Sequence, residues 1–300
     1  MATVTDAPRR EPLSSEHDPE PPAKRRIVAS PAAWAVWGVV IFFAVNLAGV
    51  IGSVVVNSIG ERWFDTWLPQ AWTGRWYGEA WEAFNLFHVI LVTLEVSGLV
   101  VALSLFIGVP ASYVLARRNF PGKRVVYLLF LLPILMPPIT YGIPLATVLY
   151  KFGLAGHLSG VVLANLVPSV PFVILTMTPF IEQVDPRIEN AARMCGATTR
   201  SIFTRVLTPL LLPGILAASI LVLVRTVGMF ELTFLTAGAD SQTLVVALYY
   251  SMSAAGIRAQ QSVDAMAVIY TSMMLVLLVL ALRLVNPTQL VARVREEPEP

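Results

Sequence analysis

The stretch VDPRIENAARMCGATTRSIFTRVLTP (184–209) lies between two long apolar segments, and its pattern predicts a folded structure rather than a plain loop. Asp185 is a suitable N-cap, and Pro186 at the first helical position is a strong start signal. Gly196 predicts the end of this first helix, because glycine adopts the left-handed conformation without strain. We therefore expect a short helix, a glycine turn and a second short helix in the 184–209 segment.

Each short helix has an apolar face. Thr198 or Thr199 can cap the second helix. Small side chains let another surface approach closely, and the flanking charges fix its register. We therefore expect the first helix to be a docking element. The residues that recur at helical spacing are Ile188, Ala191, Ala192 and Cys195 in the first helix, and Ile202, Phe203, Val206 and Leu207 in the second.

The composition of the chain is that of a membrane protein. Hydrophobic residues make up 56% of its 300 residues and charged residues only 13%, about half the charged share of a soluble domain. Charge-free runs long enough to cross a hydrocarbon core of ~30 Å predict six spans, and backbone groups in lipid must be paired within each segment. We predict an all-α membrane protein with six transmembrane helices, near 33–57, 96–116 (starting near His88), 125–150, within 152–181, from 206, and near 265–282.

The positions of Lys and Arg predict the orientation in the cell membrane. With the N-terminus inside, sixteen of the 21 Lys and Arg residues face the cytoplasm, four face outwards and Arg225 lies within a span. This positive-inside bias predicts that both termini are cytoplasmic. We expect residues 1–30 to be a disordered N-terminus, 31–287 the six-span domain and 288–300 a C-terminal tail.

Three segments depart from a simple helix bundle. The 232–257 segment is apolar but short for a span, so we predict a re-entrant or surface-lying half-helix. Pro133, Pro137 and Pro138 each remove a helical hydrogen bond, which predicts a broken or kinked third helix. The outer loop 61–84 holds five of the seven Trp residues. This density favours a belt at the membrane–water interface, with ligand stacking as the alternative.

Polar and ionisable residues within the spans are candidates for a translocation path. Arg225 lies in the outer half of span five, and Glu231 follows six residues later on a different helical face. Glu95, near the outer end of span two, is the predicted partner of Arg225. Asn165 and Thr226 are polar companions able to line a cavity. For Arg225 we expect a structural ion pair first, with a place in the path and a side chain that reaches the lipid headgroups as the alternatives.

Motifs for other chemistry are absent from the sequence. It contains no G-x-x-x-x-G-K-[ST] loop, no H-E-x-x-H and no G-x-S-x-G, and its three His residues lie far apart. Cys195 is the single cysteine, which excludes an internal disulfide and a multi-cysteine metal site. Its basic residues are used for membrane topology rather than for nucleic acid. We predict no catalytic residue, no metal site and no enzyme activity.

The 184–209 segment resembles the cytoplasmic signature of binding-protein-dependent ABC importer permeases: Glu-Ala-Ala, three residues, Gly, nine residues, Ile, one residue, Leu-Pro. Every spacing is kept, and the resemblance extends from about His88 to Asn286. An Asn replaces the family's Glu, next to Glu189, and Val and Thr replace Ile and Leu. The matching positions are Asn190, Ala191, Ala192, Gly196, Val206, Thr208 and Pro209.

The resemblance implies a function for the segment and for the chain. In the family, this segment forms a coupling helix that sits in a cleft of the ATP-hydrolysing subunit. The chain is then one permease subunit of an ATP-driven importer, forms half of the solute path and works by alternating access. Its implied partners are a second permease, two ATP-binding subunits and an extracytoplasmic solute-binding protein. ATP and Mg belong to the ATP-binding subunits, so no cofactor is expected in this chain.

The resemblance also bears on the substrate. The stretch LPQAWTGRWYGEAW (68–81) is most similar to permeases of the sugar-importer type. The stretch VRTVGMFELTFLTAGADSQTLVVALYYS (224–251) also resembles the polyamine and ferric-iron branches. We therefore expect a sugar or related carbohydrate, with polyamine and ferric iron as alternatives. A rival of another class is a secondary transporter driven by an ion gradient, which needs no ATPase partner.

Overall fold

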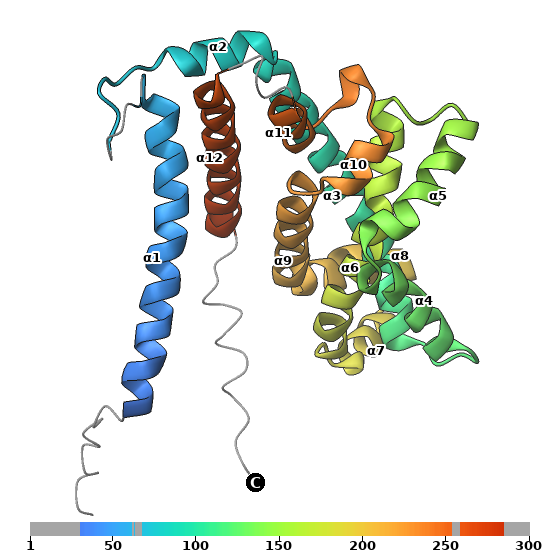
Figure 1. The fold of residues 1–300 in the computed structure, drawn as a ribbon. Helices are drawn as coiled ribbons and strands as arrows, with labels where there is room; N and C mark the ends of the chain where they lie inside the picture. The colour runs from blue at the N-terminus through green and yellow to red at the C-terminus, as the bar shows by residue number, and fades with distance from the viewer. Residues whose placement is uncertain (1–30, 62, 64–67, 254–258, 285–300) are drawn as a thin grey trace, which may run out of the picture. The chain divides into compact units, whose positions relative to one another are not determined.

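The computed structural model describes residues 31–61, 63, 68–253 and 259–284 (Figure 1). The predicted N-terminal segment 1–30 and C-terminal tail 288–300 lie outside these residues. Within the described ranges every regular element is a helix, apart from one isolated antiparallel bridge between Gly60 and Trp72. The predicted all-α fold is confirmed.

Five helical stretches of the described chain are long and apolar enough to cross a membrane. Their lengths match the expected spans, because each apolar run continues as a helix until charged or turn-forming residues interrupt it. They are α1 (Pro31–Ile59), α3 (Leu86–Arg117), α6 (Leu158–Glu182), the stretch Thr199–Val227 that ends in α9 (Thr208–Val227), and α12 (Gln260–Leu284).

The third predicted span is not one straight helix. It consists of α4 (Lys123–Leu135) and α5 (Pro138–Lys151), which meet at an angle of 99°. Met136 is extended, with φ −87° and ψ 142°, because the residue before a proline is disfavoured in the helical region. Pro138 then starts α5. The predicted break is confirmed, and the sixth span exists only if this bent pair counts as one.

The chain divides into two compact units, Met1–Val50 and Ile51–Pro300. In the first unit, every described side chain from Trp34 to Val50 is exposed. These side chains are almost all apolar, and apolar side chains exposed on a helix of this length are stable in lipid.

The core of the second unit is formed by α3, α6 and α9 (Figure 1). The contact between α3 and α6 is the most extensive of all the helix pairs described. At Gly108, a Cβ atom would lie 2.6 Å from Val173 Cγ1, so only glycine permits this close approach of the two helices. The fully buried residues of this core include Val100, Val173, Met177, Ile181, Ala218 and Val222.

The Trp-rich loop 61–84 contains a short helix, α2 (Arg75–Ala83), that packs against α12. Trp76 is buried, and its Nε1 donates to the carbonyl of Gly60 at 2.8 Å. Trp72 and Trp81 are exposed by 56% and 45%. One Trp is therefore structural, and the interface belt stays a prediction for the exposed ones.

The 232–257 segment forms short helices, with 254–258 outside the described residues. These are α10 (Glu231–Thr236), the 3-10 turn η2 (Ala239–Ser241) and α11 (Leu244–Ser253). None of them reaches the length of a span, as expected for this segment.

Candidate functional site

The 184–209 segment has the predicted order of helix, turn and helix. Asp185 caps α7 (Pro186–Met194) by accepting a hydrogen bond from the Arg187 amide at 2.8 Å. Gly196 follows with φ +80°, in the left-handed region that favours glycine. Thr198, rather than Thr199, caps α8 (Thr199–Ser201), because its Oγ1 accepts from the Ser201 amide at 3.3 Å.

The second helix continues as a π-helix, η1 (Ile202–Leu207), where the sequence predicted an ordinary helix. The Thr208 amide and its Oγ1 both donate to the carbonyl of Phe203, five residues earlier. The wide turn lies directly before Pro209. In a regular α-helix the ring of Pro209 would clash with the carbonyl of Arg205, four residues earlier. Pro209 also has no N–H group to donate to that carbonyl. A π-turn at this place is a feature often found at functional sites.

The exposed surface of α7 carries apolar side chains between the exposed Arg187, Asn190 and Arg193. Met194 is exposed by 89% and Ile188 by 42%, and Ala191 and Cys195 are exposed with them. Ala192 is partly buried against the core, so the predicted face of small residues is divided between two sides of the helix. Among the other predicted residues of the segment, Asn190, Gly196 and Pro209 are exposed and Val206 is partly buried.

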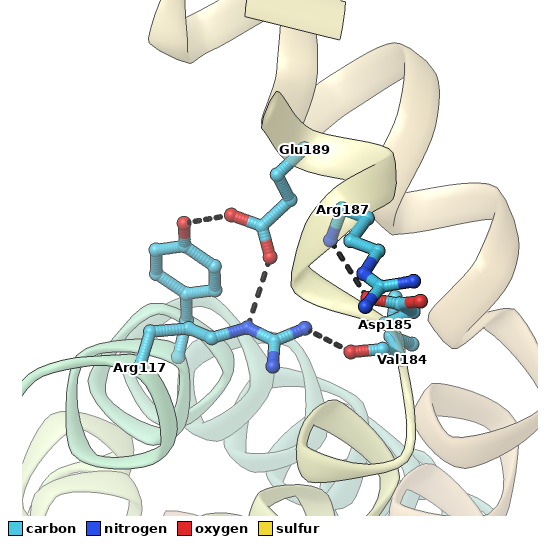
Figure 2. Close-up of polar contacts among 6 residues, drawn as sticks. Arg117, Val184, Asp185, Arg187 and Glu189 are labelled. Atoms are coloured by element: carbon cyan, nitrogen blue, oxygen red, sulfur yellow. Dashed lines mark hydrogen bonds and ion pairs between the residues drawn. The ribbon is translucent and has the colours of Figure 1, made fainter. Parts of the chain in front are cut away.

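Glu189, the neighbour of Asn190 in the chain, points inwards. Its side chain is buried, and Arg117 Nε donates to Glu189 Oε1 at 2.9 Å (Figure 2). Tyr113 Oη donates to the second carboxylate oxygen, Oε2, at 2.6 Å. Both carboxylate oxygens are thus bonded by side chains of α3, whereas Asn190 is exposed.

Arg117 makes a second contact with the segment. Its Nη2 donates to the carbonyl of Val184 at 2.5 Å, at the junction between α6 and α7 (Figure 2). The ring of Tyr113 packs edge-on against Phe203 of η1, with the ring centroids 5.8 Å apart. Sequence reasoning missed these roles of Tyr113 and Arg117, since nothing in their spacing links them to residues more than 65 positions later.

The predicted ion pair of Arg225 with Glu95 is wrong. In the described chain no ion pair involves either residue. Glu95 is exposed on α3, whereas the Arg225 guanidinium is partly buried and lies over the ring of Phe172, 5.5 Å from its centroid. The cation therefore interacts with the face of an aromatic ring of α6.

The other predicted path residues are not gathered into one cluster by hydrogen bonds. Asn165 is buried and donates to the carbonyl of Val161 and to Thr233 Oγ1, so it connects α6 with α10. Thr226 is buried, and its hydroxyl has no hydrogen-bond partner in the described structure. Glu231 is partly buried at the start of α10.

An aromatic cluster joins α10 and α11. Phe230 stacks on Phe234 at 5.2 Å between centroids, and Tyr249 contacts both rings, at 4.9 and 5.4 Å. Tyr250 contacts Phe234 at 5.8 Å. Tyr249 and Tyr250 are each 45% exposed. The sequence analysis missed this cluster, although Phe230 and Phe234 are one helical turn apart and the two Tyr residues are adjacent.

Among the described residues, no three His, Cys, Asp or Glu side chains are placed to hold a metal ion.

Residues 108–289 match the family described as "Binding-protein-dependent transport system inner membrane component". The chain is 35% identical to a probable sulfate transport system permease protein, cysT, of Chlorokybus atmophyticus, over 46% of this chain and 52% of that protein. It is 31% identical to the molybdenum transport system permease protein ModB of Escherichia coli, over 54% and 78%. It is 33% identical to the trehalose transport system permease protein SugB of Mycobacterium tuberculosis, over 47% and 52%.

The fold is similar to a solved structure of a bacterial ABC transporter involved in the import of the acidic polysaccharide alginate. The TM-score is 0.68 at 19% identity, over 83% of this chain and 94% of that one. The chain spans about half the length of the sulfate and trehalose relatives. All three relatives are permease proteins, which supports the prediction of a non-catalytic membrane component.

Proposed function

Since the chain belongs to the family of binding-protein-dependent transport system inner membrane components, we propose that it forms half of the solute path of an ATP-driven importer. Its proposed partners are a second permease, two ATP-binding subunits and an extracytoplasmic solute-binding protein. ATP and Mg would be held by the ATP-binding subunits, and both termini of this chain would lie in the cytoplasm.

The exposed surface of α7 carries this proposal. A helix of nine residues, capped by Asp185 and ended by Gly196, presents Ile188 and Met194 to the outside. Exposed apolar side chains next to charged ones are typical of a protein interface. Because α7 follows α6 and leads into α9 through η1, a partner that moves α7 acts on two core helices.

This geometry supports a mechanism of alternating access. Closure of the two ATP-binding subunits would shift α7, and the core of α3, α6 and α9 would reopen the path towards the outside. Proline residues within α6 and the break between α4 and α5 provide places where helices bend.

A sugar or related carbohydrate is the substrate that we propose first. In the aromatic cluster of Phe230, Phe234, Tyr249 and Tyr250, the two Tyr side chains are exposed. The C–H groups of a sugar ring pack on aromatic faces, and its hydroxyl groups bond to polar neighbours. The similarity to a trehalose transport permease supports this class.

An oxyanion is a second candidate, favoured by a different observation. Arg225 lies within α9 without a carboxylate partner in the described chain. A guanidinium is suited to oxyanions because its donors form a planar fork, and two relatives are sulfate and molybdenum permease proteins.

The experiment that tests the proposal is purification of the tagged chain from its native host. We expect an ATP-binding subunit to copurify with the wild type and to be lost from Met194→Glu, which places a charge on the α7 surface. Asn119→Glu places the same charge on an exposed residue of the loop between α3 and α4, outside α7 and outside the spans, and serves as the control for interface specificity. Uptake driven by an ion gradient, without any ATP-binding subunit, would favour the secondary transporter instead.

The substrate is tested on the same complex in proteoliposomes supplied with its solute-binding protein. ATP-dependent uptake of a labelled disaccharide, but not of molybdate or sulfate, is expected. Uptake of the oxyanions instead would establish the second candidate, and uptake of a polyamine or ferric iron would overturn both.

A further inference from the structure

We infer that Arg117 and Glu189 are positioning residues that make the cytoplasmic end of α3 move together with α7. This inference rests on the proposed function, because it concerns how a movement of α7 reaches the membrane helices. It assigns a mechanical role to two side chains that lie 72 positions apart in the chain.

The first step is that the two charges are enclosed. The side chain of Arg117 is 14% exposed and that of Glu189 6% exposed, in a segment whose other charged side chains face outwards. Removal of one member of a buried pair leaves the other charge uncompensated, which is strongly unfavourable. The structure therefore resists any displacement of α7 that would separate Glu189 from Arg117.

The second step is that Arg117 holds three parts of the chain at one point. It is the last residue of α3, it contacts Glu189 on α7 with Nε, and it bonds the Val184 carbonyl at the end of α6 with Nη2 (Figure 2). The 184–209 segment is joined covalently only to α6 and α9. Without Arg117, α3 has no polar connection to α7 other than the Tyr113 hydroxyl.

The third step is that the backbones of these helices contribute little to the connection. The backbones of α7 and η1 have no extensive contact with α3. An open groove of about 430 Å³ lies between α3 on one side and α8 and η1 on the other. Its lining consists of Pro110, Tyr113, Val114, Thr199, Arg200, Phe203 and Thr204. The contacts of α3 with α7 and η1 are therefore made by side chains, and the pair of Arg117 with Glu189 is the charged one among them.

The consequence concerns the core of the second unit. Because α3 has its largest contact with α6, a shift of α7 that reaches both helices would move them as one body. A shift that reaches only α6 and α9 would instead have to slide α6 against α3, at the close contact of Gly108 with Val173. Because the ion pair connects α7 to α3 as well, α3 and α6 shift together and α6 does not slide against α3.

The test uses the purified complete transporter and compares Arg117→Gln, Glu189→Gln and the exchange Arg117→Glu with Glu189→Arg. Arg118→Gln is the matched control, since Arg118 is adjacent and exposed. Abundance, copurification of the ATP-binding subunit, ATP hydrolysis and uptake per ATP are measured. We expect each single change to keep hydrolysis and to lower uptake per ATP about tenfold. The exchange should restore part of it, since the reversed ion pair can form while the bond to the Val184 carbonyl is lost.

A milder variant distinguishes a loss of coupling from a loss of folding. Tyr113→Phe keeps the ring against Phe203 and removes only the hydroxyl that bonds Glu189, so we expect normal abundance and a smaller fall in uptake per ATP. Normal coupling in all variants at normal abundance would overturn the inference. A loss of abundance that the exchange does not repair, with normal coupling in Tyr113→Phe, would also overturn it by showing a merely structural role.

The two proposals fail in different ways. If no ATP-binding subunit copurifies with the wild-type protein and no ATP-dependent uptake is measured, the proposed function is wrong. The inference is then wrong as well, because it rests on that function. If the wild type and Arg118→Gln transport normally and the ion-pair variants do the same, only the inference is wrong.

Discussion

Asn165 of α6 donates a hydrogen bond from Nδ2 to Thr233 Oγ1 of α10 at 3.2 Å, and both side chains are buried. This bond joins a core helix to the short helices that follow α9. Asn165, which was expected to line a cavity, therefore connects α6 with α10. Leu232, the chain neighbour of Thr233, is also fully buried. The contact therefore lies in a packed environment, where an unpaired amide is unfavourable.

We expect Asn165→Leu to destabilise the protein by about 1–3 kcal/mol, because the Thr233 hydroxyl loses its partner inside the core. Thermal unfolding in detergent measures the change. Thr178→Val is the control, since the Thr178 hydroxyl is buried in the same helix and bonds only the Ile174 carbonyl of that helix. Equal losses of stability in the two variants would show that the bond to α10 has no special importance.

Gly196→Val is expected to leave the protein inserted at normal abundance but to lower uptake per ATP hydrolysed. A Cβ at Gly196 meets nothing within 4 Å, so the effect comes from the backbone, whose φ of +80° is unfavourable for a β-branched residue. Uptake and ATP hydrolysis in proteoliposomes check this result.

Gly74→Val is the matched control for Gly196, because Gly74 is also free of neighbours within 4 Å but has φ −98°. We expect it to transport normally. Full coupling in Gly196→Val would contradict the prediction.

Cys195 is expected to react with a membrane-impermeant maleimide in inverted vesicles and to be protected when the ATP-binding subunit is bound. It is exposed at the end of α7, next to Met194. It is the single cysteine of the chain, so no second thiol obscures the result. Labelling from the outside of intact cells would contradict the cytoplasmic placement of α7, and labelling unaffected by the ATP-binding subunit would contradict the docking role.

Arg225→Ala is expected to lower uptake without lowering abundance, and Glu95→Gln to change neither. The double variant should equal Arg225→Ala, since no ion pair joins these side chains in the described structure. A double-mutant cycle on uptake measures this additivity. Rescue of Arg225→Ala by Glu95→Gln would show that the two charges meet during transport.

Phe172→Leu separates the aromatic contact of Arg225 from its role in the path. Loss of the ring removes an interaction worth about 0.5–2 kcal/mol, so a moderate loss of stability is expected while uptake is retained. Loss of uptake as large as that of Arg225→Ala would mean that Phe172 holds the guanidinium in its working position.

The sequence predicted the elements that depend on local chemistry. Asp185 and Gly196 set the two ends of α7 through a side-chain cap and a left-handed turn, and each effect involves only a few neighbouring residues. The break before Pro138 and the apolar helices followed in the same way from proline geometry and from the pairing of backbone groups in lipid.

Contacts between distant residues were not predictable, because they depend on which helix faces pack together. The sequence placed Glu189 beside Asn190 and paired Arg225 with Glu95. In the tertiary structure Arg117 instead contacts Glu189. Glu95 is exposed on α3, whereas Arg225 lies over Phe172, so these two charges do not form a pair. Charge and spacing by themselves determine the helices, many of their ends and the helix–turn–helix order of the 184–209 segment. The tertiary structure decides which charges meet, because long side chains reach partners that chain spacing does not reveal.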